Sequence, residues 1–340
     1  MLFLAAVNQR KYDMENTTNT QERNQGVSIA KTFGMSDVPA EILTTAFADN
    51  THPLIPQSEE SYVFRRELIR DILAFLDNPR GDGLYFAGHY GSGKTSLPMQ
   101  IAARLNWPTQ TADGNEEFNV EDLLGRPDLQ NGSGTFIYGS LAKAMKEGHI
   151  FVFNEIDTVP GGRLTAIHDV LEGRPLVLHA NGGEVIKPHP NFRLIATGNS
   201  IGNGDTTGSY QGVNVMNIAF MDRFRVVNVD YPDEAIDRMI LSKIASDLPE
   251  TIRNKMVETA NEIRRLFVGG DNVDTTLTIT MSTRALTRWA YLTLDFRNAP
   301  QPVMYALEQS LTSKAEPEQR EAIHELAKAK FGDILDQSIS

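Results

Sequence analysis

A chain of 340 residues with 41% hydrophobic and 22% charged residues has the composition of a folded protein that is large enough for more than one domain. Its formal net charge of −12 argues against a general affinity for nucleic acid, because binding to phosphate backbones requires clustered lysine and arginine. Without cysteine it can form neither disulfides nor thiolate metal sites, and no apolar run approaches the roughly 20 residues that span a bilayer. We therefore expect a cytoplasmic protein with no signal peptide and no membrane span.

The first part of the chain divides into a polar and a partly apolar segment. Residues 1–25 are rich in Asn, Thr, Gln and Glu without apolar periodicity, which predicts a flexible leader. Over residues 26–58, short apolar patches are separated by Pro39, Pro53 and Pro56. This pattern predicts a small extension that packs on the domain that follows.

Predicted strands and helices alternate over residues 59–231. Apolar side chains recur at helical spacing between Val63 and Leu76, and a second helix is predicted from Lys94 to about Leu105. Short apolar runs predict buried parallel strands at residues 84–87, 150–153, 192–197 and 225–229. Such alternation predicts an α/β fold, in which helices sandwich a mostly parallel sheet.

Two further patterns complete the predicted architecture. The turn signal at residues 181–183 lies amid alternating apolar residues between Leu176 and Ile186, which predicts a β-hairpin. From Asp233 onward the apolar periodicity is helical, so residues 232–340 are predicted to form a C-terminal helical domain.

A glycine-rich loop joins the strand at residues 84–87 to the helix that starts near Lys94. The pattern G-x-x-x-x-G-K-T lets backbone N–H groups surround a phosphate, while the helix N-terminus adds positive potential. Lys94 would reach the β- and γ-phosphates, and Thr95 would ligate Mg²⁺. The pattern predicts that ATP and Mg²⁺ bind to Gly88, His89, Tyr90, Gly91, Ser92, Gly93, Lys94, Thr95 and Ser96.

The strand at residues 150–153 runs into Asn154-Glu155, where ATPases with this loop usually carry two carboxylates, one for Mg²⁺ and one to activate water. Glu155 is therefore the predicted general base. Asn154 could accept a hydrogen bond from a metal-bound water but contributes no charge, so Mg²⁺ affinity or turnover could suffer. Asp157 either compensates for that charge or caps a helix before Pro160.

Four further stretches make a family resemblance specific. They are residues 102–108, 188–194, 204–210 and 221–223, with the sequences AARLNWP, PHPNFRL, GDTTGSY and MDR. On these residues the chain resembles AAA+ ATPases of the MoxR type, and most closely the CobS subunits of aerobic cobaltochelatases, from about Val27 to about Trp289. The resemblance implies an AAA+ P-loop core followed by a helical lid, with the run 204–210 as its most discriminating part.

The resemblance also implies roles for single residues. Asn199 is similar to sensor 1, which orients the attacking water, and Arg223 is similar to the arginine finger that reaches the γ-phosphate of a neighbouring subunit. Arg225 is a weaker candidate for that finger. Arg284 resembles sensor 2 on the lid, although Thr283 stands where the family commonly has proline.

The resemblance extends to two loops, whereas three residues of the predicted lid are assigned from the burial expected of their side chains. Residues 126–138 resemble the family's helix-2 insert and residues 174–188 its hairpin before sensor 1, and both would face the axis of a ring; a plain surface hairpin is the alternative. Met281, Trp289 and Tyr291 are predicted to belong to the helical core of the lid and not to a tetrapyrrole pocket.

Three functions are compatible with these residues. The resemblance implies a homo-oligomeric, hexameric ATPase ring that drives metal insertion by a larger chelatase subunit, with a von Willebrand A-domain partner. A MoxR-type chaperone acting on another protein target is the second hypothesis. The third is an ATP-gated assembly module that barely hydrolyses ATP, because Asn154 lacks the usual charge.

Overall fold

The computed structural model describes residues 23, 25–130, 133–204, 212–269 and 277–336. The leader predicted over residues 1–25 lies outside this part of the chain except for Arg23 and Gln25. Most of the run 204–210 lies outside it as well.

A five-stranded parallel sheet forms the centre of the first domain, with the strand order β11-β3-β10-β7-β4. Its strands are β3 (Gly83–Ala87), β4 (Thr109–Asp113), β7 (Ile150–Asn154), β10 (Arg193–Gly198) and β11 (Phe224–Asn228). The four strands predicted from apolar runs are confirmed. The edge strand β4 was not predicted, because its sequence TQTAD is polar and only one side chain in it is buried.

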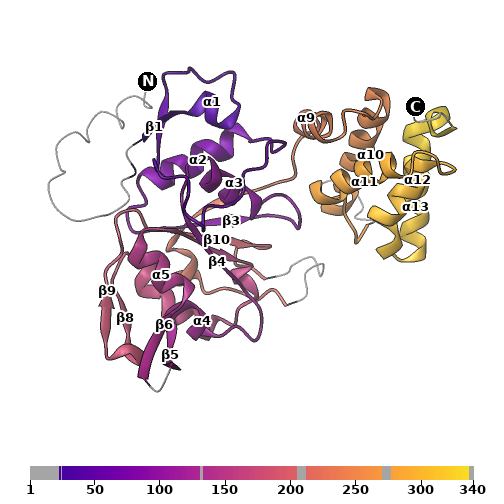
Figure 1. The fold of residues 1–340 in the computed structure, drawn as a ribbon. Coiled ribbons are helices and arrows are strands. Elements are labelled where there is room, and N and C mark those ends of the chain that lie inside the picture. Colours follow the sequence, from indigo (N-terminus) through magenta and orange to yellow (C-terminus); the bar gives the residue numbers. More distant parts are fainter. Residues whose placement is uncertain (1–22, 24, 131–132, 205–211, 270–276, 337–340) are drawn as a thin grey trace.

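Helices cover both faces of the sheet, as the alternation of its side chains requires. Leu84 and Phe86 of β3 pack into one core with α2 (Arg66–Asp77) and α3 (Ser96–Arg104), whereas Tyr85 and Ala87 pack into another with α5 (Ser140–Glu147). Figure 1 shows α2 and α3 on one side of the strands and α5 on the other. The helices predicted from Val63 and from Lys94 are confirmed as α2 and α3. The short helices α4 (Val120–Leu124), α6 (Gly161–Leu164), α7 (His168–Leu171) and α8 (Ile218–Met221) complete this domain.

The segment before α2 packs on the α2–α3 face. It contains β1 (Gln25–Ser28), which pairs antiparallel with β2 (Leu43–Ala46), and the short helix α1 (Ile29–Phe33). Phe33 and Phe47 are buried in the same core as the α2 side chains. Arg23 lies over the ring of Trp107, 4.4 Å from its centroid, so the strand pair is tied to the end of α3.

Two antiparallel hairpins lie beside each other at one end of this domain (Figure 1). One pairs β5 (Gly125–Gln130) with β6 (Ser133–Tyr138), and the other pairs β8 (Leu176–Leu178) with β9 (Glu184–Ile186). The Tyr138 hydroxyl donates a 2.7 Å hydrogen bond to Glu184, which joins them. The hairpin predicted between Leu176 and Ile186 is thereby confirmed.

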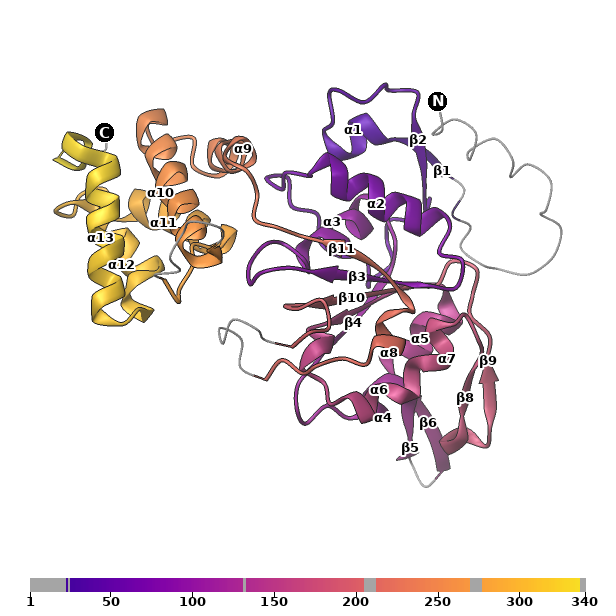
Figure 2. The same cartoon turned by 180° about the vertical axis from the view of Figure 1, so that it is seen from behind.

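The C-terminal region is helical, as predicted, and has a core of its own. Its helices are α9 (Glu234–Ile244), α10 (Glu250–Val268), α11 (Thr283–Asp295), α12 (Pro302–Ser310) and α13 (Pro317–Phe331). Figures 1 and 2 show this bundle beside the sheet domain, connected to it by the chain that leads from β11 to α9. None of the helices in the described residues is long and apolar enough to cross a membrane.

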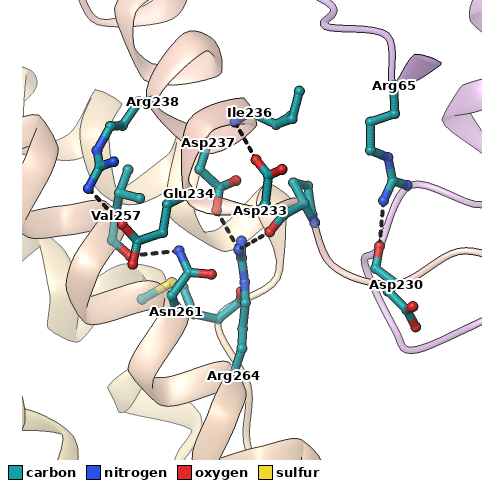
Figure 3. A network of polar contacts seen from close by, with 12 residues as sticks. Arg65, Asp230, Asp233, Glu234, Ile236, Asp237, Arg238, Val257, Asn261 and Arg264 are labelled. Carbon is teal, nitrogen blue, oxygen red and sulfur yellow. Dashed lines mark hydrogen bonds and ion pairs between the residues drawn. The ribbon is translucent and has the colours of Figure 1, made fainter. Parts of the chain in front are cut away.

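A buried arginine ties the connecting chain to this helical lid (Figure 3). Arg264 forms an ion pair with the fully buried Asp237 of α9. Its Nε atom donates a 2.7 Å hydrogen bond to the carbonyl of Met281, and its Nη1 atom donates one of 3.3 Å to the carbonyl of Pro232. The Arg264 side chain thus joins the chain that connects β11 to α9, helix α9 itself and the segment just before α11.

Candidate nucleotide site

The loop between β3 and α3 combines close packing with left-handed backbone. Gly91 has a φ of 70°, and a Cβ there would lie 2.3 Å from the Cβ of Ser282. The same approach allows the Thr283 N–H to donate to the carbonyl of Gly91 at 3.4 Å. Glycine at this position therefore lets the start of lid helix α11 touch the loop.

Lys94 lies beneath the loop and is only 8% exposed. Its Nζ atom donates to the carbonyls of Gly88 at 2.8 Å and His89 at 2.9 Å, and to Oδ1 of Asn199 at 3.0 Å. Burial lowers the pKa of Lys94 to about 8, against the raising influence of Asp157 and Glu155. The predicted phosphate-binding lysine and the predicted sensor 1 are thus in direct contact.

Glu155 and Asn199 reach the same edge of the sheet because they follow two adjacent parallel strands, β7 and β10. Glu155 is exposed and has a φ of 50°, a left-handed conformation that costs a non-glycine residue about 1–2 kcal/mol. Its N–H donates a 3.1 Å hydrogen bond to Oγ1 of Thr197 in β10. Such local strain is typical of functional residues.

Asn154 is held by a residue that the sequence reasoning did not single out. Its Nδ2 atom donates a 2.9 Å hydrogen bond to Oδ1 of Asp113, the last residue of β4. The Oδ1 atom of Asn154 is buried and has no hydrogen-bond partner in the described residues. The hydrogen bond to Asp113 therefore fixes the orientation of a buried carbonyl oxygen at the end of β7.

Asp157 does not take the helix-capping role that was one of its two predicted roles. It is fully buried, and its Oδ2 atom accepts hydrogen bonds from the N–H groups of Asn199 at 2.7 Å and Ser200 at 3.0 Å. Desolvation raises the pKa of its carboxyl. The carboxylate is turned toward the sensor-1 segment, where it anchors the backbone of Asn199, and it caps no helix.

A cavity of about 630 Å³ connects these groups with the lid. Its size is within the range of small-molecule sites. Loop residues Tyr90 to Ser96, together with Glu155, Thr197, Asn199 and Arg284, line its polar side. Gly88 and His89 are not among the lining residues; the ring of His89 packs parallel to Tyr231, with centroids 5.8 Å apart.

Apolar and aromatic residues, which were not predicted, also line the cavity. Tyr62, Val63, Met99, Ile240, Ile244 and Tyr291 line it. The prediction that Tyr291 belongs to the lid core is wrong, since its side chain is 47% exposed, whereas Met281 and Trp289 are fully buried in that core. Tyr291 follows Arg284 by two helical turns and thus shares its face of α11, a spacing that could have revealed it.

Arg223 lies outside this cavity. Its Nε atom donates a 2.8 Å hydrogen bond to Glu172, which also forms an ion pair with it, and its side chain is 25% exposed. Both residues line a separate surface cavity with Arg80 and Asp82. Arg225, the weaker candidate for the finger, bonds instead to Asp82 at 2.8 Å. Arg223 is therefore not part of the cavity that Lys94 and Glu155 line in this structure.

Two family models match most of the chain. The model described as AAA domain (dynein-related subfamily) matches residues 83–224, and that described as CbbQ/NirQ/NorQ C-terminal matches residues 237–330.

The chain is also similar to individual proteins. The aerobic cobaltochelatase subunit CobS of Sinorhizobium sp. is 30% identical over 325 residues, which cover 92% of each chain. An uncharacterized protein of Staphylococcus epidermidis is 28% identical over 239 residues, 69% of this chain and 84% of its own. Among solved structures, the Thermotoga maritima RuvB Holliday junction branch migration motor has a TM-score of 0.43 and 14% identity, over 75% of this chain and 72% of its own. The chain belongs to the MoxR-type AAA+ ATPases, in the family of the cobaltochelatase subunit CobS.

Proposed function

We propose that this chain binds ATP with Mg²⁺ in the cavity between the loop and the lid and hydrolyses it. The observation that carries the proposal is the meeting of Lys94, Glu155, Asn199 and Arg284, from four separate segments, around one cavity. Lys94 and Arg284 supply positive charge for the phosphates, and Glu155 supplies a base for water. The lining residues Tyr62 and Tyr291 are aromatic and suit a nucleotide base.

The residues present fit a magnesium ion bound together with the nucleotide. The exposed Thr95 side chain lines the cavity. Asn154 is not itself a lining residue but directly precedes one, Glu155, and its buried Oδ1 atom is an acceptor that a metal-bound water would satisfy. Thr95 would hold the ion directly and Asn154 through water, while the ion neutralises phosphate charge. Hard oxygen ligands of this kind are the ones that Mg²⁺ prefers.

Hydrolysis in this site divides the work between residues at the sheet edge. Glu155 accepts a proton from the attacking water, and the side-chain amide of Asn199 orients that water. Asn199 is placed by Asp157 through its backbone and by Lys94 through its side chain. When phosphate oxygens compete for Lys94, the Asn199 side chain is released toward the cavity.

A phosphate-release assay tests the ATPase proposal. The wild-type protein is expected to release phosphate in a Mg²⁺-dependent way, and both Lys94→Ala and Glu155→Gln are expected to abolish release. Glu155→Gln should still bind ATP, because Glu155 is assigned to water and not to the phosphates. An inactive wild-type protein that nevertheless binds ATP would favour the alternative of an ATP-gated assembly module, for which the missing charge at Asn154 is the supporting observation.

We further propose that the active form is a cytoplasmic homo-hexameric ring in which Arg223 reaches the site of a neighbouring subunit. Its position outside the cavity of its own subunit supports this assignment. Because the CobS relative is a cobaltochelatase subunit, we propose a larger chelatase subunit as a partner. The family resemblance adds a von Willebrand A-domain protein as a second proposed partner.

The target is tested by capture. The Glu155→Gln variant in ATP is expected to retain the chelatase subunit, and reconstitution with the wild-type ring is expected to support cobalt insertion. Capture of an unrelated protein in place of the chelatase would favour the alternative, a MoxR-type chaperone acting on a different target.

A further inference from the structure

Asp113, the last residue of β4, places a carboxylate at the end of the sheet where the strands terminate, and it belongs to none of the motifs described above. Asp113 and Asn154 are directly paired in the register of the parallel strands β4 and β7, so their side chains leave the sheet on the same face. The 2.9 Å hydrogen bond from Asn154 Nδ2 to Asp113 Oδ1 joins them. The side-chain negative charge that is absent at Asn154 is thus present one strand farther out.

Geometry makes this pair directional. Because a carboxylate accepts hydrogen bonds and cannot donate them, Asp113 binds only the NH₂ group of Asn154 and turns the carbonyl oxygen the other way. That oxygen is buried without a partner in the part of the chain that the structure describes. A hydrogen bond to an ionised acceptor also polarises the amide, which strengthens its oxygen as an acceptor.

We propose that Asp113 is a positioning residue for the magnesium site: it orients and polarises Asn154 so that an amide performs the task usually left to a carboxylate. The inference rests on the proposed binding of Mg²⁺ with ATP. Partners that orient metal ligands from one shell farther out typically change metal affinity by about 10- to 100-fold when they are removed. Asp113 itself touches neither the nucleotide nor the reacting atoms in this account.

The backbone supports the same pairing. The N–H of Gly114 donates a 2.8 Å hydrogen bond to the carbonyl of Asn154. The end of β4 and the end of β7 are therefore joined through both backbone and side chains. A substitution that removes only the charge of Asp113 leaves this backbone bond in place.

The test measures the Mg²⁺ dependence of nucleotide binding with a fluorescent ATP analogue, without reference to turnover. Asp113→Asn is expected to weaken apparent Mg²⁺ affinity by about 10-fold, while affinity for the analogue in EDTA stays at the wild-type value. Glu117→Gln, which removes an exposed carboxylate from the loop that follows β4, serves as the matched control and should leave both values unchanged.

A charge swap provides the rescue. Asn154→Asp alone would place two carboxylates in contact, so the informative variant combines Asn154→Asp with Asp113→Asn. The Mg²⁺ affinity of this double variant is expected to lie within about threefold of the wild-type value. Asp113→Asn alone, by contrast, is expected to lose about 10-fold in Mg²⁺ affinity. If Asp113→Asn matches the Glu117→Gln control, or if the swap binds Mg²⁺ no better than Asp113→Asn, Asp113 has no such role. If the wild-type protein binds the analogue equally well with Mg²⁺ and in EDTA, the proposed magnesium site is wrong, and if it binds the analogue in neither condition, the proposed nucleotide site itself is wrong.

Discussion

Gly114 is the position where a single methyl group should separate nucleotide binding from hydrolysis. A Cβ at this residue would lie 2.3 Å from the carbonyl oxygen of Glu155 and 2.9 Å from its carbonyl carbon. Since carbon and oxygen atoms normally approach to about 3.3 Å, Gly114→Ala requires the Glu155 backbone to move by about 1 Å. A displacement of that size in a catalytic group costs on the order of 100-fold in rate.

Two measurements distinguish this effect from general damage. Turnover at saturating ATP is expected to fall by about two orders of magnitude, whereas ATP affinity should stay near the wild-type value because the loop and Lys94 are untouched. Gly134→Ala, where nothing lies within 4 Å of the added Cβ, is the matched control. Turnover of Gly114→Ala within about twofold of wild type would refute the view that Glu155 is held in place by this contact.

Three further predictions concern titration and the lid. Burial lowers the pKa of His149 to about 4 from its ordinary value of 6.5, so the unfolded chain binds more protons in this window. The free energy of unfolding should therefore decrease as the pH is lowered from 6.5 to 4, and His149 should account for at most about 3 kcal/mol of this decrease. Unfolding curves measured at several pH values should show a smaller decrease for His149→Gln than for the wild type. The pKa of Lys94 is about 8, and a bound phosphate favours the charged form of its side chain. ATP binding at pH 8 should therefore take up about half a proton per site, which calorimetry in two buffers of different ionisation enthalpy measures. Arg264→Met leaves the carboxylate of Asp237 buried without its cation, so denaturant unfolding should show a loss of about 3–5 kcal/mol.

Each of these has an outcome that would count against it. A pH profile of His149→Gln that superimposes on the wild type would place the acid sensitivity elsewhere. A binding enthalpy at pH 8 that is the same in both buffers would contradict the assigned pKa of Lys94. If combining Arg264→Met with Asp237→Leu recovers none of the stability, the ion pair is not the cause of the loss.

The central part of the fold was predictable because it depends on local patterns. The strand before the loop, the glycine-rich loop and helix α3 follow one another within residues 83–104, so spacing alone identifies them. The buried strands β7 and β10, with the sequences IFVFN and RLIATG, each contain a short apolar run, as is typical of parallel strands covered on both faces. The hairpin at residues 176–186 has a glycine turn between alternating side chains.

What could not be predicted depends on contacts between distant parts of the chain. The edge strand β4 is polar because one of its sides faces solvent, and its sequence resembles a loop. Asp113 meets Asn154 across 41 positions, and Asp157 meets the Asn199 backbone across 42. Only the parallel pairing of the strands brings such residues to one edge. The domain boundaries and the roles of the site residues stay predictions, and the role of Arg223 in addition depends on a neighbouring chain.

Subunit mixing tests most directly whether this chain is an ATPase whose site is completed by a neighbour. Arg223→Ala subunits keep a complete cavity of their own, and Lys94→Ala subunits keep an intact Arg223. Each variant alone is expected to release little phosphate, and an equimolar mixture should recover a substantial part of the wild-type rate at interfaces that combine the two intact parts. Full activity of Arg223→Ala alone would contradict the claim that a neighbouring subunit completes the site. The same holds if the wild-type protein is active but the mixture is as inactive as each variant alone.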